Sequence, residues 1–291
     1  MIDFRLETFL TVCRYMNFTR AAEALHLTQP AVSQHIKHLE KVYAAPLFVR
    51  DKKRLALTPA GVILRDALET THSDEAILRR RMQDSMAGAQ VLTFGVTRTI
   101  GEYAILDPLA RLIKAHPHSH FRIRYGNTQT LLAGLHEGSI DFAIVEGYFN
   151  AAQYGTQTYR SEEYIAAAAA NHAFARPVRR LRDLTGERLL LREPGSGTRE
   201  ILVRALALQN LSLSDFSPIV EVENIHTIVA LLRQDCGISF LYKAAVEEDL
   251  ERGILRQIPL EDFSVQHDFT FIWNRGSIFS KDFQSIFQAL Q

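Results

Sequence analysis

Four polar side chains near the N-terminus repeat at helical spacing, in a pattern suited to contacting the edges of nucleic-acid bases. Gln29, Ser33 and Lys37 stand four residues apart, and Gln34 follows Ser33. Amide and hydroxyl groups donate to and accept from base edges, and a lysine pairs with phosphate. This side of the segment lies away from an apolar stripe formed by Val32, Ile36, Leu39 and Tyr43 at about 100° per residue. Two readings stay open here: a DNA recognition helix, or the solvated face of an ordinary three-helix bundle.

The surrounding residues predict the elements that would position this face. Residues 17–41 read as two short helices joined by a tight turn, with Thr28 as N-cap and Pro30 in the first turn of the second helix. Residues 47–50 and 54–57 are short apolar runs around a basic tip, which predicts a hairpin wing beside the second helix. The residues predicted to contact DNA are Thr28, Gln29, Pro30, Ser33, Gln34, Lys37, Arg50, Lys53 and Arg54.

The distribution of charged residues along the chain also favours DNA binding by the N-terminal segment. Residues 1–58 hold nine Lys/Arg and five Asp/Glu, a net of +4, and because the whole chain sums to zero the other residues carry −4. Positive charge is therefore concentrated where the negatively charged DNA backbone would lie.

Four motifs follow one another in the first 65 residues: Phe18-Thr19-Arg20-Ala21-Ala22, Leu27-Thr28-Gln29-Pro30-Ala31-Val32-Ser33, Leu47-Phe48 with Arg50, and Leu57-Thr58-Pro59-Ala60-Gly61. With these motifs at this spacing, the segment resembles the bacterial LysR-type transcriptional regulators. Two departures from the family pattern are visible. The glycine usual after the recognition helix is replaced around Tyr43-Ala44-Ala45, and arginine is common where Gln34 stands.

A long helix is expected after the wing. Thr58-Pro59 is a helix start, and no helix breaker follows from Ala60 to Ala87. Its apolar side is too long to bury against one small domain. The resemblance implies that this helix pairs with its copy in a homodimer or homotetramer; the alternative is a helix packed along its own chain.

From Val91 the pattern changes to alternating strands and helices, which predicts parallel strands with helical crossovers. The expected strands are 91–96, 121–125, 140–146, 166–170, 188–192, 219–222 and 237–241, and the expected helices are 102–115, 130–137, 198–209 and 225–233. By resemblance, the fold class is α + α/β: an N-terminal winged helix-turn-helix, a long linker helix and a C-terminal two-lobed periplasmic-binding-protein-like α/β effector domain. The expected division is 1–58 for DNA binding, 59–87 for the linker (dimerisation) helix, 91–160 plus 266–291 for effector lobe I, and 161–265 for effector lobe II.

Ligands of such a fold lie between the lobes, where strands end and helices begin. Two segments rich in hydroxyls and glycines, 97–101 and 193–199, follow predicted strands, and helix N-termini there favour an anion. We therefore expect a small anionic effector; helix capping alone is the competing explanation. The segment 195–199 is also similar to a family subset that includes regulators of sulfur assimilation and carbon fixation. The candidate effector residues are Thr97, Arg98, Thr99, Ile100, Thr128, Gly195, Ser196, Thr198 and Asn224.

Other classes of protein find less support. The chain has neither a nucleophile–base constellation nor a His-x-x-x-His or Cys-x-x-Cys pair, so we expect no enzyme, no metal site and no cofactor besides the effector. Two distant cysteines, an N-terminus without a signal-peptide pattern and no apolar run near the ~18 residues of a membrane span predict a cytoplasmic protein with no membrane partner. The expected partners are double-stranded promoter DNA and further copies of the chain, with RNA polymerase as a candidate. A solute-binding or sensor module without active DNA regulation is the alternative function.

Overall fold

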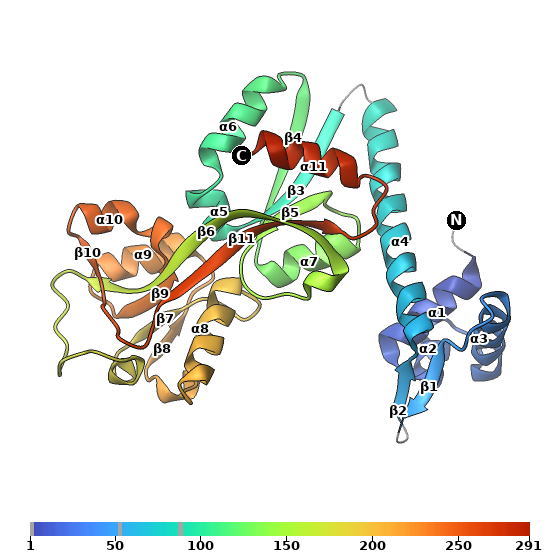
Figure 1. The fold of residues 1–291 in the computed structure, drawn as a ribbon, viewed down its shortest axis with the longest axis horizontal. Helices are drawn as coiled ribbons and strands as arrows, with labels where there is room; N and C mark the ends of the chain where they lie inside the picture. The colour runs from blue at the N-terminus through green and yellow to red at the C-terminus, as the bar shows by residue number, and fades with distance from the viewer. Residues whose placement is uncertain (1–2, 52–53, 87–89) are drawn as a thin grey trace.

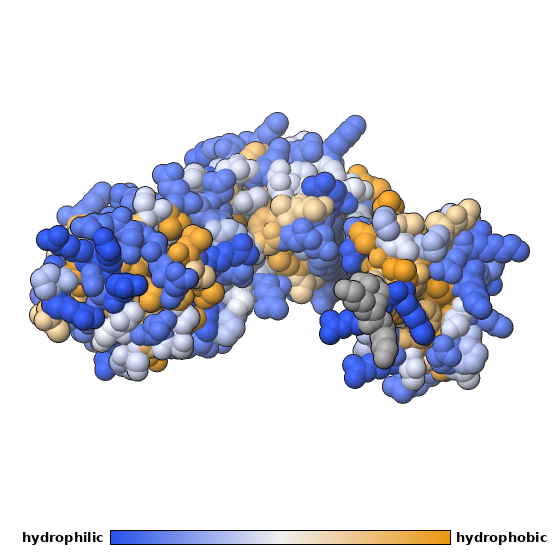
Figure 2. All heavy atoms as spheres, turned by 60° about the horizontal axis from the view of Figure 1, so that its bottom comes forward, coloured by the Kyte–Doolittle hydropathy of each residue, from blue (hydrophilic) through white to orange (hydrophobic). Residues whose placement is uncertain are grey.

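The computed structural model describes residues 3–51, 54–86 and 90–291. A small N-terminal unit and a larger two-lobed body are joined by one long helix (Figure 1). Figure 2 shows a hollow between the N-terminal unit and the body. None of the described helices combines the length and apolarity needed to cross a membrane.

The N-terminal unit is a helix-turn-helix with a wing, as predicted. Phe48 on the wing packs between Phe9 and Phe18, with ring centroids 5.5 and 5.7 Å apart, and this fixes the hairpin to the helices. Val32, Ile36 and Leu39 are buried as predicted, whereas Tyr43 is 47% exposed because the helix ends one residue before it. The elements are α1 (Phe4–Tyr15), α2 (Phe18–Ala24), α3 (Gln29–Val42), β1 (Phe48–Asp51) and β2 (Arg54–Leu57).

The turn after α3 places a residue with a side chain in a left-handed conformation. Ala44, in the segment where the family usually has glycine, has φ of +50°. Its methyl group is exposed, so what disfavours alanine here is its own backbone rather than a neighbouring side chain.

The long helix α4 (Pro59–Met86) begins as the sequence predicted, with the Gly61 N–H donating to the Thr58 hydroxyl at 3.0 Å. Gly61 is required by close packing, because a Cβ there would lie 2.1 Å from the Leu47 carbonyl oxygen. The apolar side of α4 was expected to be too long to bury against one small domain, and in the structure the helix contacts two units of its own chain. The helix packs first on the N-terminal unit and then on the body, and it buries Gly61, Leu68, Ser73, Asp74 and Ile77.

The two-lobed body is built on one continuous sheet with the order β4-β3-β5-β11-β6-β9-β7-β8, and β10 pairs with β6. We call the side that contains β4, β3 and β5 lobe I and the side that contains β9, β7 and β8 lobe II. The elements are β3 (Gln90–Thr97), α5 (Arg98–Tyr103), α6 (Leu106–Ala115), β4 (Ser119–Gly126), α7 (Thr128–His136), β5 (Phe142–Val145), η1 (Ala151–Gln153), β6 (Tyr154–Ala169), η2 (Leu181–Leu184), β7 (Leu189–Leu191), α8 (Gly197–Leu208), η3 (Leu213–Asp215), β8 (Ile219–Glu221), α9 (Ile225–Arg233), β9 (Ile238–Tyr242), η4 (Lys243–Ala245), α10 (Glu247–Glu251), β10 (Leu255–Gln257), β11 (Val265–Asn274) and α11 (Ser280–Ala289).

Two long antiparallel strands connect the lobes. β6 pairs with β11 along its first part and with β9 from Tyr164 onward, so it belongs to both lobes. The register between β6 and β11 shifts between Phe269 and Thr270. The alanine-rich segment 166–170, whose own propensity is helical, forms the end of β6 through Ala169 because it pairs with β9 and β10.

The other strands and helices for which the sequence predicted bounds begin and end within two residues of those bounds, with one exception. The expected helix 102–115 is two helices, α5 and α6, which meet at Ala104 and Ile105. Pro108 explains the break: in a continuous helix its ring would clash with the carbonyl of Ala104, whereas in the first turn of α6 it is tolerated.

The Ala44 conformation gives a stability prediction. Ala44→Gly is expected to stabilise the protein by about 0.5–1 kcal/mol, because glycine adopts a positive φ without the penalty that a Cβ carries. Urea unfolding followed by circular dichroism measures the change. Ala45→Gly is the control, since the neighbouring residue does not have a positive φ; an Ala44→Gly variant no more stable than wild type contradicts the prediction.

Candidate functional site

Most of the described residues that were predicted to contact DNA are exposed on α3 and the wing, and Ser33 is half-buried. Thr28 caps α3, accepting from the Ala31 N–H at 3.3 Å, and Pro30 lies in the first turn. Both residues are exposed, as are Gln29, Gln34 and Lys37 along the helix, so capping and DNA contact are compatible for Thr28.

A groove of about 570 Å³ separates α3 from the wing. Its wall on α3 includes Gln29, Ser33 and Lys37, and its wall on the wing includes Arg50. The Gln29 amide donates to the Ser33 hydroxyl at 2.8 Å, which holds the two side chains together at the start of the helix. Arg54 is exposed at the wing, and Lys53 lies outside the described residues.

The second site lies where the two lobes meet, between the end of β5 and the start of α8. Gly147, with φ of +86°, approaches Gly197 so closely that a Cβ on Gly147 would lie 2.4 Å from the Gly197 Cα. A Cβ on Gly197 would lie 2.2 Å from the Glu146 carbonyl oxygen. The lobes are thus in direct backbone contact, and only glycine permits this approach.

A buried carboxyl group occupies the junction. Glu146 is 1% exposed, and its two oxygens accept hydrogen bonds from opposite lobes: Thr97 donates to Oε2, and Thr198 donates to Oε1 at 3.1 Å. Thr128, at the start of α7, donates to the Glu146 carbonyl oxygen at 2.7 Å. Three residues predicted to bind an effector therefore converge on one acidic residue of the chain itself.

The location of Glu146 follows from the sheet. β3 and β5 are adjacent parallel strands, and Thr97 and Glu146 stand at their carboxyl ends. Thr97 precedes α5 and Thr198 lies in the first turn of α8, so both helices present their N-terminal ends to this place. Burial raises the pKa of Glu146, and the two hydroxyl hydrogen bonds oppose that rise.

Around Glu146 are polar groups that have no hydrogen-bond partner among the described residues. These are the hydroxyls of Thr99 and Ser196, the Arg98 Nε and the Arg192 Nη1. Thr99, Ser196 and Arg192 are each at least 97% buried. Arg192 is also paired with Glu193, with Nε 2.8 Å from Oε2. The junction thus has more donors than the Glu146 carboxyl group uses.

The remaining candidate residues have other surroundings. Ile100 is fully buried in the main hydrophobic core, and Asn224 caps α9 by accepting from the Thr227 N–H at 3.3 Å. Gly195 has φ of +85°, and its carbonyl oxygen accepts from the Gln129 N–H at 3.3 Å across the junction. Gly195 is therefore part of the contact between the lobes, whereas Ile100 and Asn224 have structural roles.

Sequence reasoning missed Glu146, although it identified the threonines that surround it. The available signal was its position as the last residue of the predicted strand 140–146. Further contacts close the junction. The Arg204 guanidinium lies 3.7 Å from the Tyr148 ring centroid, and Asn127 donates to Glu193 at 3.4 Å. Among the described residues, no group of three or more His, Cys, Asp and Glu side chains is placed to hold a metal ion.

A winged helix-turn-helix joined to a two-lobed α/β body with a polar junction defines the class of ligand-responsive transcriptional regulators. Residues 4–62 match the family described as bacterial regulatory helix-turn-helix protein, lysR family, and residues 87–291 match the LysR substrate binding domain. The chain belongs to the LysR family of transcriptional regulators.

Curated relatives agree over nearly the whole chain. The regulator CysL of Bacillus subtilis is 29% identical over 92% of this chain and 89% of its own length. The regulator CfxR of Cupriavidus necator is 30% identical over 95% of this chain and 86% of its own length.

Solved structures share the fold. The Synechocystis CcmR regulatory domain in complex with 2-PG has a TM-score of 0.59 at 18% identity and covers 69% of this chain and 97% of its own. Full-length LysG of Corynebacterium glutamicum with bound effector Arg has a TM-score of 0.58 at 17% identity, over 100% of this chain and 98% of its own.

The raised pKa of Glu146 predicts a pH-dependent stability. The folded protein holds this proton at pH values where the unfolded chain has lost it, so stability falls as pH rises through the folded pKa. Glu146→Gln has no such proton to lose, so the stability of the variant relative to wild type is expected to rise as pH rises above the ordinary pKa of a glutamate. Urea midpoints measured from acidic to neutral pH test this prediction, with Glu200→Gln on the exposed side of α8 as control. Parallel pH profiles for wild type and Glu146→Gln contradict it.

Proposed function

We propose that this protein is a homo-oligomeric regulator that binds double-stranded promoter DNA and changes its DNA binding or bending when a small anion enters the junction between its lobes. The proposed division assigns 1–58 to DNA binding, 59–87 to the linker helix, 91–160 with 266–291 to lobe I, and 161–265 to lobe II. One observation carries the effector part: the buried donors around Glu146 exceed what its carboxyl group accepts.

DNA binding is supported by the chemistry of the exposed α3 surface. Gln29, Ser33 and Gln34 offer donors and acceptors for base edges, while Lys37 and Arg50 flank the groove with charge for phosphates. In this proposal α3 enters the major groove and the wing contacts the adjacent backbone.

Pairing through α4 is supported by its outer surface. While one side of α4 is buried in its own chain, Ile63, Leu78, Met82 and Met86 are exposed. Exposed apolar side chains along one helix are typical of a surface that another chain covers. A dimer formed there presents two copies of α3 to a two-fold DNA site.

An anion is the effector class that the junction favours. Hydroxyls and helix N-termini from both lobes already stabilise the Glu146 carboxyl group, so the same surroundings suit an external carboxylate or oxyanion. Each buried donor left without a partner costs roughly 1–3 kcal/mol, and a ligand with several acceptor oxygens recovers part of that cost. Entry of the ligand requires the Glu146 side chain to leave its present position or to stay protonated.

The regulator with a ligand-responsive cleft is favoured over two alternatives. A sensor module without DNA function leaves the exposed groups of α3 without a role, and the curated relatives of the chain are transcriptional regulators rather than enzymes. The proposed compartment is the cytoplasm, where promoter DNA is found, with RNA polymerase as a candidate further partner. Regulation requires the effector to bind the two arrangements of the lobes with unequal affinity.

Substitutions on α3 and the wing are expected to distinguish residues that contact the DNA backbone from residues that recognise bases. Arg50→Ala should weaken binding to all DNA sequences about equally and reduce the slope of log affinity against log salt by about 1. Gln34→Ala should instead change the base preference at one position, by about 1–3 kcal/mol. Fluorescence anisotropy with a selected site and single-base variants, at several salt concentrations, measures both. Equal effects of both variants on every sequence would show that Gln34 does not read bases.

A thermal-shift screen of sulfate, phosphate, nitrate and small mono- and dicarboxylates tests the effector class. An anion at about 100 times its dissociation constant adds roughly 2.7 kcal/mol of stability. Ser196→Ala removes a buried donor and is expected to weaken binding of the same anion about tenfold. Ser285→Ala, on the exposed side of α11, is the control. If anions stabilise wild type and Ser196→Ala alike, the anion does not lie at this junction.

A further inference from the structure

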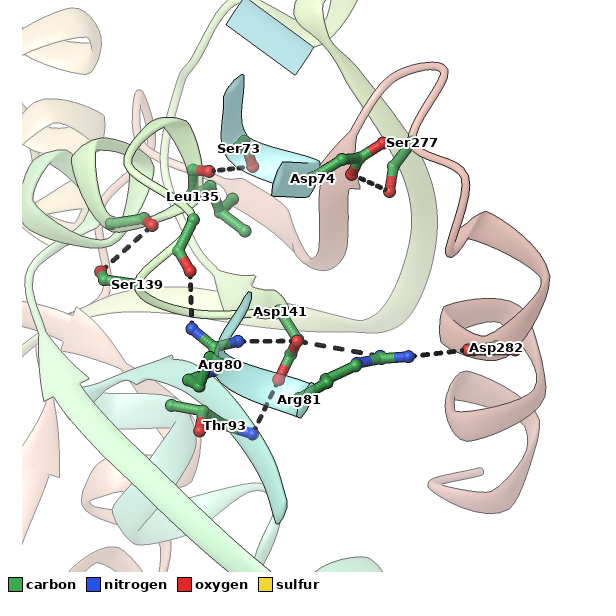
Figure 3. A network of polar contacts seen from close by, with 12 residues as sticks. Ser73, Asp74, Arg80, Arg81, Thr93, Leu135, Ser139, Asp141, Ser277 and Asp282 are labelled. Atoms are coloured by element: carbon green, nitrogen blue, oxygen red, sulfur yellow. Dashed lines mark hydrogen bonds and ion pairs between the residues drawn. The ribbon is translucent and has the colours of Figure 1, made fainter. Parts of the chain in front are cut away.

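The second half of α4 is fixed to lobe I by a buried ion pair (Figure 3). Asp141 is 1% exposed, and its Oδ1 lies 2.8 Å from the Arg80 Nη2. The same arginine donates through Nη1 to the Gly138 carbonyl oxygen at 2.6 Å, and the Thr93 N–H donates to Asp141 Oδ2 at 2.8 Å. Arg80 thus joins α4 to β3 and to the residue that precedes β5.

A second buried set lies about two turns earlier on the helix. Ser73 donates to the Leu135 carbonyl oxygen at 2.9 Å, and the Asn274 amide donates to both of these groups at 2.7 Å. Asp74 accepts from the Ser277 hydroxyl at 2.6 Å and from the Ile278 N–H at 2.9 Å. All four polar side chains are buried, so separation of α4 from lobe I would leave them without partners.

Arg81 adds a third attachment, at the edge of lobe I. Its Nη1 donates to Asp282 at 3.0 Å, and its guanidinium carbon lies 4.2 Å from the centroid of the Phe279 ring. Contacts of α4 with lobe I therefore extend over two turns and hold the helix in one orientation (Figure 3).

Two elements run from these attachments to the junction between the lobes. β5 begins one residue after Asp141 and ends one residue before Glu146, a span of roughly 17 Å at 3.3 Å per residue. α7 has Thr128, which donates to the Glu146 carbonyl oxygen, at its first residue, and Leu135, which accepts from Ser73, near its end. Glu146 is thus connected to α4 by a strand and a helix, each held by hydrogen bonds at both ends.

We propose that β5 and α7 act as parallel rods that carry a displacement of Glu146 to α4, with Arg80 and Asp141 as positioning residues for the linker helix. A buried strand and a packed helix transmit displacement because close-packed interiors are stiff. A displacement of Glu146 relative to the rest of lobe I then shifts the second half of α4, the helix that carries the DNA-binding unit. The regulatory meaning of this coupling rests on the proposed function, but the coupling itself is testable without any effector.

Hydrogen exchange followed by mass spectrometry on the full-length protein tests the coupling. Glu146→Gln alters the junction, and its peptides at 197–202 and at 76–86 of α4 are both expected to exchange at rates at least threefold different from wild type. In the Glu146→Gln/Arg80→Met double variant, compared with Arg80→Met alone, the response at 197–202 persists and the response of α4 falls at least threefold; a remainder is expected because Ser73 and Arg81 still attach the helix to lobe I. Arg79→Met is the matched control, since Arg79 is exposed on the same helix and pairs with Glu75.

Three results overturn the proposal: no response of α4 to Glu146→Gln, a response that Arg80→Met leaves undiminished, or a response that Arg79→Met reduces equally. If Arg80→Met does not fold, Arg80→Lys keeps the positive charge but loses the two-pronged contact with Gly138 and Asp141. It is expected to reduce the α4 response at least threefold, and an undiminished response overturns the proposal. The exchange experiment uses no anion, so its result does not depend on whether the thermal-shift screen finds one. The proposal of an anionic effector and the proposal of coupling to α4 can therefore be contradicted independently.

Discussion

The arrangement of the two lobes depends on the burial of one carboxyl group. An acidic side chain is stable away from water only when its oxygens are hydrogen-bonded. For Glu146 the donors come from both lobes, since Thr97 and Thr198 lie on opposite sides of the junction. The close approach of Gly147 and Gly197 follows from the same requirement, because bulkier residues would hold Thr198 too far from Glu146. The closed junction is thus a local solution for burying a carboxyl group, built from residues that are scattered along the sequence.

The helix α4 connects the N-terminal unit to the body. Its first turns pack on the wing and α1, and its later turns are held to lobe I by Ser73, Asp74 and Arg80. A polar side chain can belong to the interior of the protein when it is hydrogen-bonded, as the side chains of Ser73 and Asp74 are. The outward side of the helix, with Met82 and Met86, remains apolar and exposed.

Periodicity and turn chemistry predicted most of the fold, because alternating apolar runs and capping residues act locally. Thr28 and Thr58 cap helices where the sequence placed them. Three features needed tertiary information: the break enforced by Pro108, the recruitment of the alanine run 166–169 into β6, and the burial of both sides of the junction. For the site, hydroxyl-rich helix starts indicated the right place, but Glu146 was missed, because nothing local to a strand end tells whether its side chain turns inward. The contacts of Ser73 with Leu135 and of Asp74 with Ser277 join residues 62 and 203 positions apart, beyond the reach of any pattern along the chain.

The register shift in the ribbon formed by β6 and β11 has a mechanical consequence. The chain crosses between the lobes along these two strands, and an irregularity between Phe269 and Thr270 bends and twists such a ribbon locally. At that step Tyr159 of β6 has no partner on β11, so the ladder is interrupted between two stretches of regular pairing. The angle between the lobes is therefore fixed least by the ribbon at this step, and the contacts across the junction take a correspondingly larger part in holding it.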